Sequence, residues 1–114
     1  MLPKLNRIKK KKDFEEIFKN SKSIKQDLLV FRVFKNGTEL KRFSPVVSLK
    51  VSKKAVVRNK IRRRLSVIMQ KFLPEVMEGY DILAIALAGL EKKEYLQLED
   101  SVKKALAKAG VLKK

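Results

Sequence analysis

Cysteine, histidine and tryptophan are absent from this sequence of 114 residues. Without cysteine and histidine, a Cys/His zinc site, a thiol nucleophile and a histidine general base are all excluded. No disulfide can form, so nothing in the sequence indicates an oxidising compartment. The usual metal ligands and general bases are therefore largely missing.

Long apolar runs are also absent. No segment approaches the roughly 20 apolar residues of a membrane-spanning helix. The sequence begins Met1-Leu2-Pro3-Lys4 and turns basic at once, without the apolar core of a signal peptide. We therefore expect a cytoplasmic protein that has no membrane partner.

Acidic residues are scarce relative to basic ones. Twelve Asp and Glu stand against 29 Lys and Arg, which gives a net charge of +17. A polyanionic partner explains such an excess best, with nucleic acid first and an anionic membrane surface second. Because 45% of the residues are hydrophobic, the chain can still bury a core. The length, without repeats or a Ser/Gly linker, predicts a single domain over residues 1–114.

The positive charge concentrates in two stretches that contain no acid. Residues 1–12, which we expect to form a basic N-terminal arm, hold six Lys and Arg, and residues 43–74 hold nine. The rest of the chain has 14 basic and 12 acidic residues. A solvated face is the ordinary explanation of a charged run. It is a weaker explanation here, because stretches this long without an acid can form no local ion pair. The sequence thus predicts two basic surfaces on a nearly neutral scaffold.

Local patterns predict six elements in the order α-β-β-α-β-α. The predicted ranges are a helix over 13–19, strands over 28–34 and 43–49, a helix over 55–73, a strand over 80–87 and a helix over 92–109. Asp13 is expected to cap the first helix, with Glu16 three residues later. Pro45 is expected to place its strand at a sheet edge or near the strand start. The order predicts a two-layer α/β (α+β) sandwich, in which a small mixed sheet has helices mainly on one face.

The helix over 55–73 is the clearest of these elements. Its apolar residues recur at helical spacing, at Val57, Ile61, Leu65, Ile68 and Phe72. At about 100° per residue, the opposite face carries Asn59, Arg62, Arg63 and Ser66. The pattern predicts a helix with one face in the core and a cationic face in solvent.

The start of this helix carries the most specific motif of the sequence. The run AVVRNKIRRR at 55–64 resembles the Ala-Val-Val-Arg-Asn-Arg-Ile-Lys-Arg-Arg-like run of the bacterial ribonuclease P protein subunit family. Weaker landmarks of that family follow in the same order: Leu2-Pro3-Lys4, DFEEIF at 13–18, VSLKV at 47–51, GYDI at 79–82, YLQLE at 95–99 and KAG at 108–110. Lys60 departs from the family run by replacing an Arg, and Ser52-Lys53-Lys54 replaces a shorter Gly-containing turn.

The family resemblance implies a function. In bacterial ribonuclease P, a large RNA performs a magnesium-dependent hydrolysis that removes the 5′ leader of precursor tRNA. The protein subunit binds this catalytic RNA and touches the leader, and it supplies no catalytic side chain. Mg²⁺ is held mainly by the RNA subunit and the substrate. A structural RNA-binding protein, such as a small ribosomal protein, is the alternative for a chain of this size and charge.

The resemblance also refines the predicted fold. It implies a ribosomal-protein-domain-like architecture with a left-handed crossover around the central helix, where the generic rule expects a right-handed one. The implied partners are the catalytic RNA and precursor tRNA, and no obligatory protein partner is expected.

The implied RNA-binding surface lies at the start of the central helix. Its candidate residues are Lys53, Lys54, Arg58, Asn59, Lys60, Arg62, Arg63 and Arg64. Arginine can fork onto phosphate or 2′-hydroxyl pairs. Lysines at a helix N-terminus add positive charge where free backbone amides already favour anions.

A cleft for the 5′ leader is implied between the first helix and the sheet. Single-stranded RNA binds grooves that combine cations with aromatic platforms. The candidate cleft residues are Phe14, Phe18, Phe31, Arg32, Ser48 and Lys50. For Phe14 and Phe18, four residues apart on a short helix, a place in the core remains an open alternative. Asp81 is expected to cap a turn or to pair with a cation, because no close acidic cluster marks a metal site.

Overall fold

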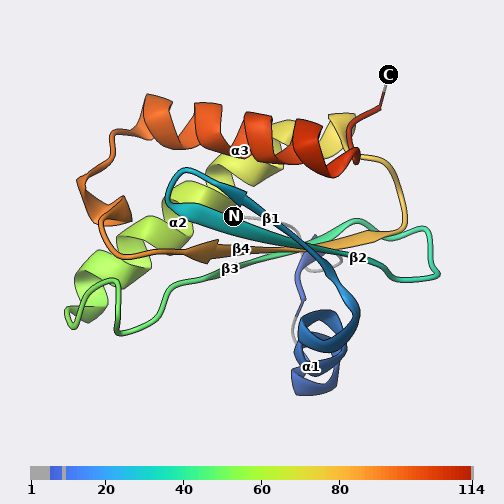
Figure 1. Ribbon diagram of the computed structural model, residues 1–114, viewed down its shortest axis with the longest axis horizontal. Coiled ribbons are helices and arrows are strands. Elements are labelled where there is room, and N and C mark those ends of the chain that lie inside the picture. Colours follow the sequence, from blue (N-terminus) through green and yellow to red (C-terminus); the bar gives the residue numbers. More distant parts are fainter. Residues whose placement is uncertain (1–5, 9, 114) are drawn as a thin grey trace.

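The computed structural model describes residues 6–8 and 10–113 (Figure 1). The landmark Leu2-Pro3-Lys4, and Lys9 of the expected basic arm, lie outside the described residues. The elements are α1 (Lys11–Asn20), β1 (Lys22–Gln26), β2 (Leu29–Lys35), β3 (Arg42–Val46), α2 (Ala55–Phe72), β4 (Tyr80–Ala86) and α3 (Tyr95–Ala109), with 3₁₀ turns η2 (Leu73–Glu75) and η3 (Leu90–Lys92). In this part of the chain the order is α-β-β-β-α-β-α, the predicted order with one added strand.

The added strand is β1, which pairs antiparallel with β2 at one edge of the sheet. Its sequence, KSIKQ, contains a single apolar side chain, Ile24, which packs against the core. Strand prediction depends on alternating apolar residues, and one such residue gives no alternation. β1 is therefore specified mainly by its pairing with the longer strand β2.

The sheet is mixed, as predicted, with the strand order β1-β2-β4-β3. β4 runs antiparallel to β2 and parallel to β3, so α2 connects two parallel neighbours. Most residues of β4 are buried, which explains its nearly continuous apolar sequence. Pro45 lies in β3, an edge strand as predicted, where a missing N–H is tolerated.

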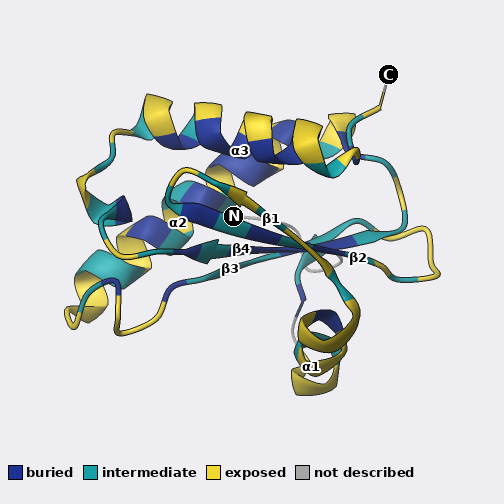
Figure 2. Cartoon of the chain, in the orientation of Figure 1, coloured by how far each residue is buried: buried dark blue, intermediate teal, exposed yellow. Residues whose placement is uncertain are grey.

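Helices lie on both faces of the sheet (Figure 1). The larger core, on the face of α2 and α3, includes Phe31 and Ile82 from the strands. α1 lies against the opposite face, where Ile17 joins Leu83 and Ile8 in a smaller cluster. Figure 2 shows the buried residues of the helices turned toward the sheet. The prediction of helices mainly on one face is confirmed for the two long helices, whereas the short α1 is on the other side.

Residues 6–8 run along the edge of β3. Arg7 forms a parallel bridge with Phe43, and the amide of Ile8 donates to the carbonyl of Phe43 at 3.4 Å. Asn6 donates from Nδ2 to the carbonyl of Lys41 at 2.6 Å. Residues 6–8 of the expected basic arm are therefore held in place by the sheet edge and by the buried side chain of Ile8.

α1 begins earlier than the predicted cap. The helix starts at Lys11, and Lys10 precedes it without a side-chain cap hydrogen bond. The predicted capping box of Asp13 and Glu16 is therefore wrong. Asp13 lies in the first turn instead and pairs with Arg42 of β3 at 3.2 Å, a partner 29 residues away. A local pattern cannot contain such a long-range contact.

α3 begins a few residues later than predicted, because η3 occupies the residues before it. A capping box sets this start: Gln97 accepts a hydrogen bond from the Glu94 amide at 2.9 Å, and the Glu94 side chain accepts one in return. Gly110 follows the helix in the left-handed conformation, at φ 72°. None of the helices in the described residues is long and apolar enough to span a membrane.

Candidate nucleic-acid interface

Two arginines of α2 hold the loop that leads into the helix. Arg58 donates from Nη1 to the carbonyl of Ser52 at 2.9 Å. Arg62 donates from Nη2 to the carbonyl of Val47 at 3.1 Å. A guanidinium group has several donors in one plane, so it can bind a backbone carbonyl and still reach a second acceptor. These contacts attach the basic loop, residues 47–54, to the first two turns of α2.

The remaining candidate cations keep their charged groups available. Among the described contacts, no ion pair or hydrogen bond involves the charged groups of Lys53, Lys54, Lys60, Arg63 or Arg64. Asn59 accepts a hydrogen bond from Arg62 Nη1 at 2.6 Å and so directs that side chain. The predicted RNA-binding set therefore divides into residues that shape the loop and residues that present charge. Since residues 43–74 contain no acid, no carboxylate of this stretch competes for that charge.

A groove follows the outer side of α2. One hollow is lined by Val56, Asn59, Arg62 and Arg63, and the next by Pro45, Arg62, Arg63, Ser66 and Val67. The two hollows share both arginines, so we treat them as one feature, the α2 groove. It runs from the start of α2 to the edge of β3, and it combines guanidinium groups with apolar walls.

With three lysines and two acidic residues, α3 is nearly balanced in charge, in contrast to α2, which has no acidic residue. Lys104 pairs with Asp100 at 2.9 Å within α3. Glu99 pairs with Lys71 near the end of α2, also at 2.9 Å. The hydrogen bond to Glu99 and its negative charge raise the pKa of Lys71 above the usual lysine value. Over the basic loop and the first half of α2, by contrast, no ion pair in the described residues offsets the positive charge.

The sheet face toward α1 is the second candidate surface. Strand pairing places one row of residues across all four strands, Ser23, Arg32, Leu83 and Ser44, and a second row beside it, Lys25, Val30, Ile85 and Val46. We call these two rows the α1-side face. Sequence analysis did not identify Ser23, because its strand was not predicted. Alternation along the strand predicted over 80–87 could have indicated that Ile85 lies on this face.

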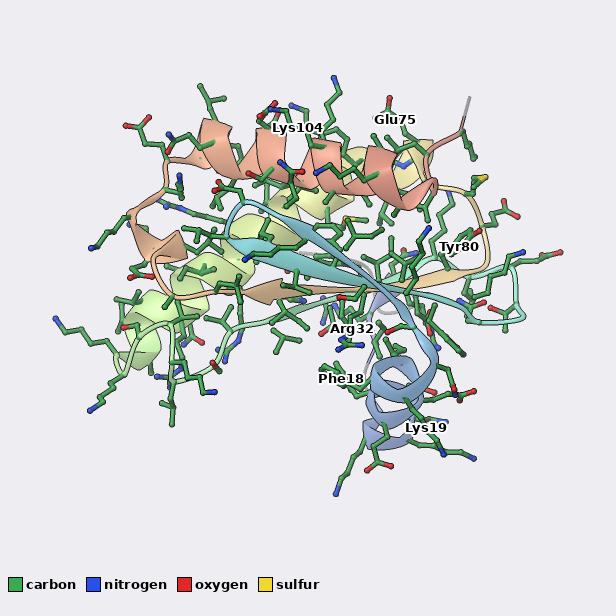
Figure 3. All side chains as sticks on the ribbon, in the orientation of Figure 1. Phe18, Lys19, Arg32, Glu75, Tyr80 and Lys104 are labelled. Atoms are coloured by element: carbon green, nitrogen blue, oxygen red, sulfur yellow. The ribbon has the colours of Figure 1, made fainter. Side chains whose placement is uncertain are left out.

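Phe18 and Arg32 meet between the end of α1 and this face (Figure 3). The guanidinium carbon of Arg32 lies 5.3 Å from the centre of the Phe18 ring, within the cation–π range. Arg32 also donates from Nη1 to the carbonyl of Phe18 and to Ser21 Oγ, both at 3.3 Å. Because Phe18 remains 45% exposed, the pair presents a cation and an aromatic ring together.

The structure separates the three phenylalanines predicted for the cleft. Phe14 is half-buried and packs against the small cluster that contains Ile17, whereas Phe18 is exposed beside Arg32. Phe31 is fully buried in the larger core on the other face of the sheet, so its prediction as a cleft residue is wrong. Successive strand residues point to opposite faces, so the sequence already contained the signal that separates Phe31 from Arg32.

Ser48 and Lys50, also predicted for the cleft, lie in the basic loop. Both are exposed, and the Lys50 amide donates to Ser48 Oγ at 3.3 Å. The loop is the segment that the two arginines hold against α2. The structure therefore groups these two residues with the RNA-binding candidates of α2.

Arg42 is a residue that sequence analysis missed. It donates from Nε to Asp81 Oδ1 at 2.8 Å and from Nη2 to Asp81 Oδ2 at 2.5 Å, and Nη1 reaches Asp13 of α1. Asn36 donates to Asp81 Oδ1 at 2.8 Å. The hydrogen bond to Asp81 raises the pKa of Arg42, although burial acts in the opposite direction. The expectation that Asp81 pairs with a cation is confirmed. The contact between Arg42 and Asp13 ties α1 to the sheet.

The carboxylates of this region do not fit a Mg²⁺ site. Magnesium needs oxygen ligands in octahedral geometry, but Arg42 already occupies both Asp13 and Asp81. In the described residues, no three Asp or Glu side chains gather closely enough to hold a metal ion.

The mixed four-stranded sheet and the acid-free connecting helix, with its available cations, define a small basic α/β protein of the ribonucleoprotein type. Comparison with known proteins supplies the family. The family model described as Ribonuclease P matches residues 2–110, and the chain belongs to this family. It is a component of the ribonuclease P holoenzyme, a tRNA 5′-end endoribonuclease.

Relatives match over nearly the full length. The ribonuclease P protein component of Pseudanabaena sp. (strain PCC 6903) is 34% identical over 98% of this chain and 97% of its own. That of Clostridium kluyveri is 38% identical over 94% and 96%. The structure of the Staphylococcus aureus RNase P protein has a TM-score of 0.87 at 30% identity, covering 96% of this chain and 100% of that one. The Thermotoga maritima protein gives 0.81 at 27%, covering 90% and 96%. The family assignment replaces the alternative of a small ribosomal protein.

Proposed function

We propose that this chain binds the catalytic RNA of ribonuclease P through the basic loop and the first half of α2. The observation that carries the proposal is a set of five cations on an acid-free segment whose charged groups have no partner among the described residues. Cations that neutralise RNA phosphates release condensed counterions, which favours binding. Arg58 and Arg62 contribute by holding the loop in the shape that the RNA meets.

The 5′ leader of precursor tRNA, in this proposal, lies along the α1-side face. Single-stranded RNA binds surfaces that combine cations with aromatic rings. Phe18 and Arg32 provide both at the end of α1. The partly exposed Val30 and Ile85 extend the surface with apolar contacts for bases or riboses.

The hydrolysis itself is assigned to the RNA subunit, with Mg²⁺ held mainly by the RNA and the substrate. The chain has neither histidine nor cysteine. The carboxylates of Asp13 and Asp81 are engaged by Arg42. The role of the protein is therefore to screen phosphate repulsion and to position RNA, which lowers the magnesium concentration that the reaction needs.

Reconstitution tests this function. At limiting Mg²⁺, adding the protein to the ribonuclease P RNA of the same organism should raise precursor tRNA cleavage by on the order of tenfold or more, because bound cations replace part of the metal-ion screening. A competing tRNA without a leader should bind the holoenzyme more weakly than precursor tRNA. Absence of any stimulation would contradict the proposed function. Equal binding of both tRNAs would contradict the proposal that the leader binds along the α1-side face.

A further inference from the structure

The outer face of α2 exposes apolar side chains among its cations. Val56 is 75% exposed and Val67 is 47% exposed. At about 100° per residue, positions 56, 63 and 67 fall within roughly 40° of each other around the helix. Arg63 therefore stands between two exposed valines on the face that points away from the core.

The α2 groove brings these residues to one surface with two different arginines. Arg62 is held by Asn59 and by the carbonyl of Val47, so its position is set before any ligand arrives. The exposed Arg63 has no hydrogen-bond partner among the described residues. Val67 and Pro45 supply apolar wall beside both guanidinium groups.

Charge complementarity identifies the class of occupant. Residues 43–74 carry nine Lys and Arg and no acid, so the groove repels cationic surfaces and attracts a polyanion. An RNA duplex offers mainly phosphates and riboses, because its bases are stacked inside. An unpaired nucleotide offers an anionic phosphate and also an apolar base face, which is the combination that this groove matches.

We propose that the α2 groove binds an unstacked nucleotide of the ribonuclease P RNA. The base or ribose packs against Val56, Val67 and Pro45, while Arg63 binds its phosphate. Arg62 is a fixed donor at the middle of the groove. This inference rests on the proposed function, and it adds a recognition element that a purely electrostatic surface would lack.

Binding measured across a range of salt concentrations tests the inference. Val56→Ala and Val67→Ala should each lower the affinity for ribonuclease P RNA by about three- to tenfold, since each removes part of an apolar contact. The slope of log affinity against log salt should not change, because no charge is lost. Arg63→Ala should instead weaken binding and reduce that slope by about one.

A matched control is available on α3. Leu96 is as exposed as Val56, at 75%, but lies on the helix with nearly balanced charges. Leu96→Ala should leave the affinity unchanged. Against a fully paired RNA duplex, the two valine variants should bind as the unsubstituted protein does. Since both valines lie outside the core, the melting temperatures of the two valine variants should equal that of the unsubstituted protein.

Each contrary result has a distinct meaning. Unchanged affinity of both valine variants would overturn the inference and leave a phosphate-binding surface. Equal losses on duplex RNA would exclude an unstacked nucleotide. A protein dimer that Val67→Ala dissociates in sedimentation would assign the groove to a second copy of the chain and also overturn it. Failure of the unsubstituted protein to bind ribonuclease P RNA would contradict the proposed function itself.

Discussion

Arginines that share one motif differ in what their guanidinium groups contact. Arg58 and Arg62 each donate to a backbone carbonyl of the basic loop, whereas Arg63 and Arg64 have no such contact among the described residues. The motif is uniform in charge, but its proposed effect on RNA binding has two origins. One origin is direct attraction, and the other is the shape of the loop between β3 and α2.

Replacing Arg58 and Arg62 together with Ala should release the basic loop without unfolding the protein. The lost hydrogen bonds should cost about 1–3 kcal/mol of the unfolding free energy, because both donors are charged but only partly buried. Amide hydrogen exchange should become faster across residues 47–54, and the affinity for ribonuclease P RNA should fall.

The matched control is the double substitution of Arg63 and Arg64 with Ala, which removes the same charge. It should weaken RNA binding while leaving hydrogen exchange in the loop unchanged. If both double variants affected the loop equally, the structural role of Arg58 and Arg62 would be refuted.

At the scale of elements, α1 is attached to the sheet at both of its ends. Near the start of the helix, Asp13 pairs with Arg42, which also holds the buried Asp81. At the end, Arg32 donates to the carbonyl of Phe18. The position of α1 beside the α1-side face therefore depends on two polar contacts as well as on the small cluster of Ile17.

Asp13→Asn should loosen the start of α1 and reduce the preference of the holoenzyme for leader-bearing tRNA. The expected loss is about 1.5- to fivefold, since a partly exposed ion pair contributes about 0.2–1 kcal/mol. Glu16→Gln makes the same chemical change at an exposed position of α1 and should leave the preference intact. The measurement is competition between precursor and mature tRNA, and an equal effect of both variants would exclude a specific role for the pair.

Elements with their own periodic pattern could be predicted from the sequence. α2 ends one residue from its predicted end, because five core residues recur at helical spacing and Pro74 follows. β1 could not be predicted, since only Ile24 of its residues is apolar. The same limit applies to the interface. The motif indicates which cations gather at α2, but it does not show that Arg62 reaches Val47, 15 residues earlier.

At the scale of the whole molecule, the net charge of +17 is distributed unevenly. α3 neutralises part of its own charge through Asp100, and Glu99 neutralises Lys71. The basic loop and the first half of α2 have no such compensation among the described contacts. The molecule therefore has a preferred orientation toward a polyanion, which increases the rate of productive encounters at low ionic strength.

Two double substitutions that remove equal charge should separate these surfaces. Lys53→Ala with Lys54→Ala should weaken binding to ribonuclease P RNA and reduce the dependence of log affinity on log salt by up to about two. Lys103→Ala with Lys108→Ala, on the exposed side of α3, should change the slope of log affinity against log salt little. Equal changes in both variants would mean that RNA binding responds only to net charge.

The edges of the sheet have a consequence for the chain before it meets RNA. β3 is shielded by Pro45 and by the pairing of Arg7 and Ile8 with Phe43. β1, at the opposite edge, is short and carries exposed lysines that repel another copy. Strands protected in this way resist the edge-to-edge pairing that nucleates fibrils. A newly made subunit that has not yet been incorporated into a particle can therefore accumulate without self-association through its β-sheet.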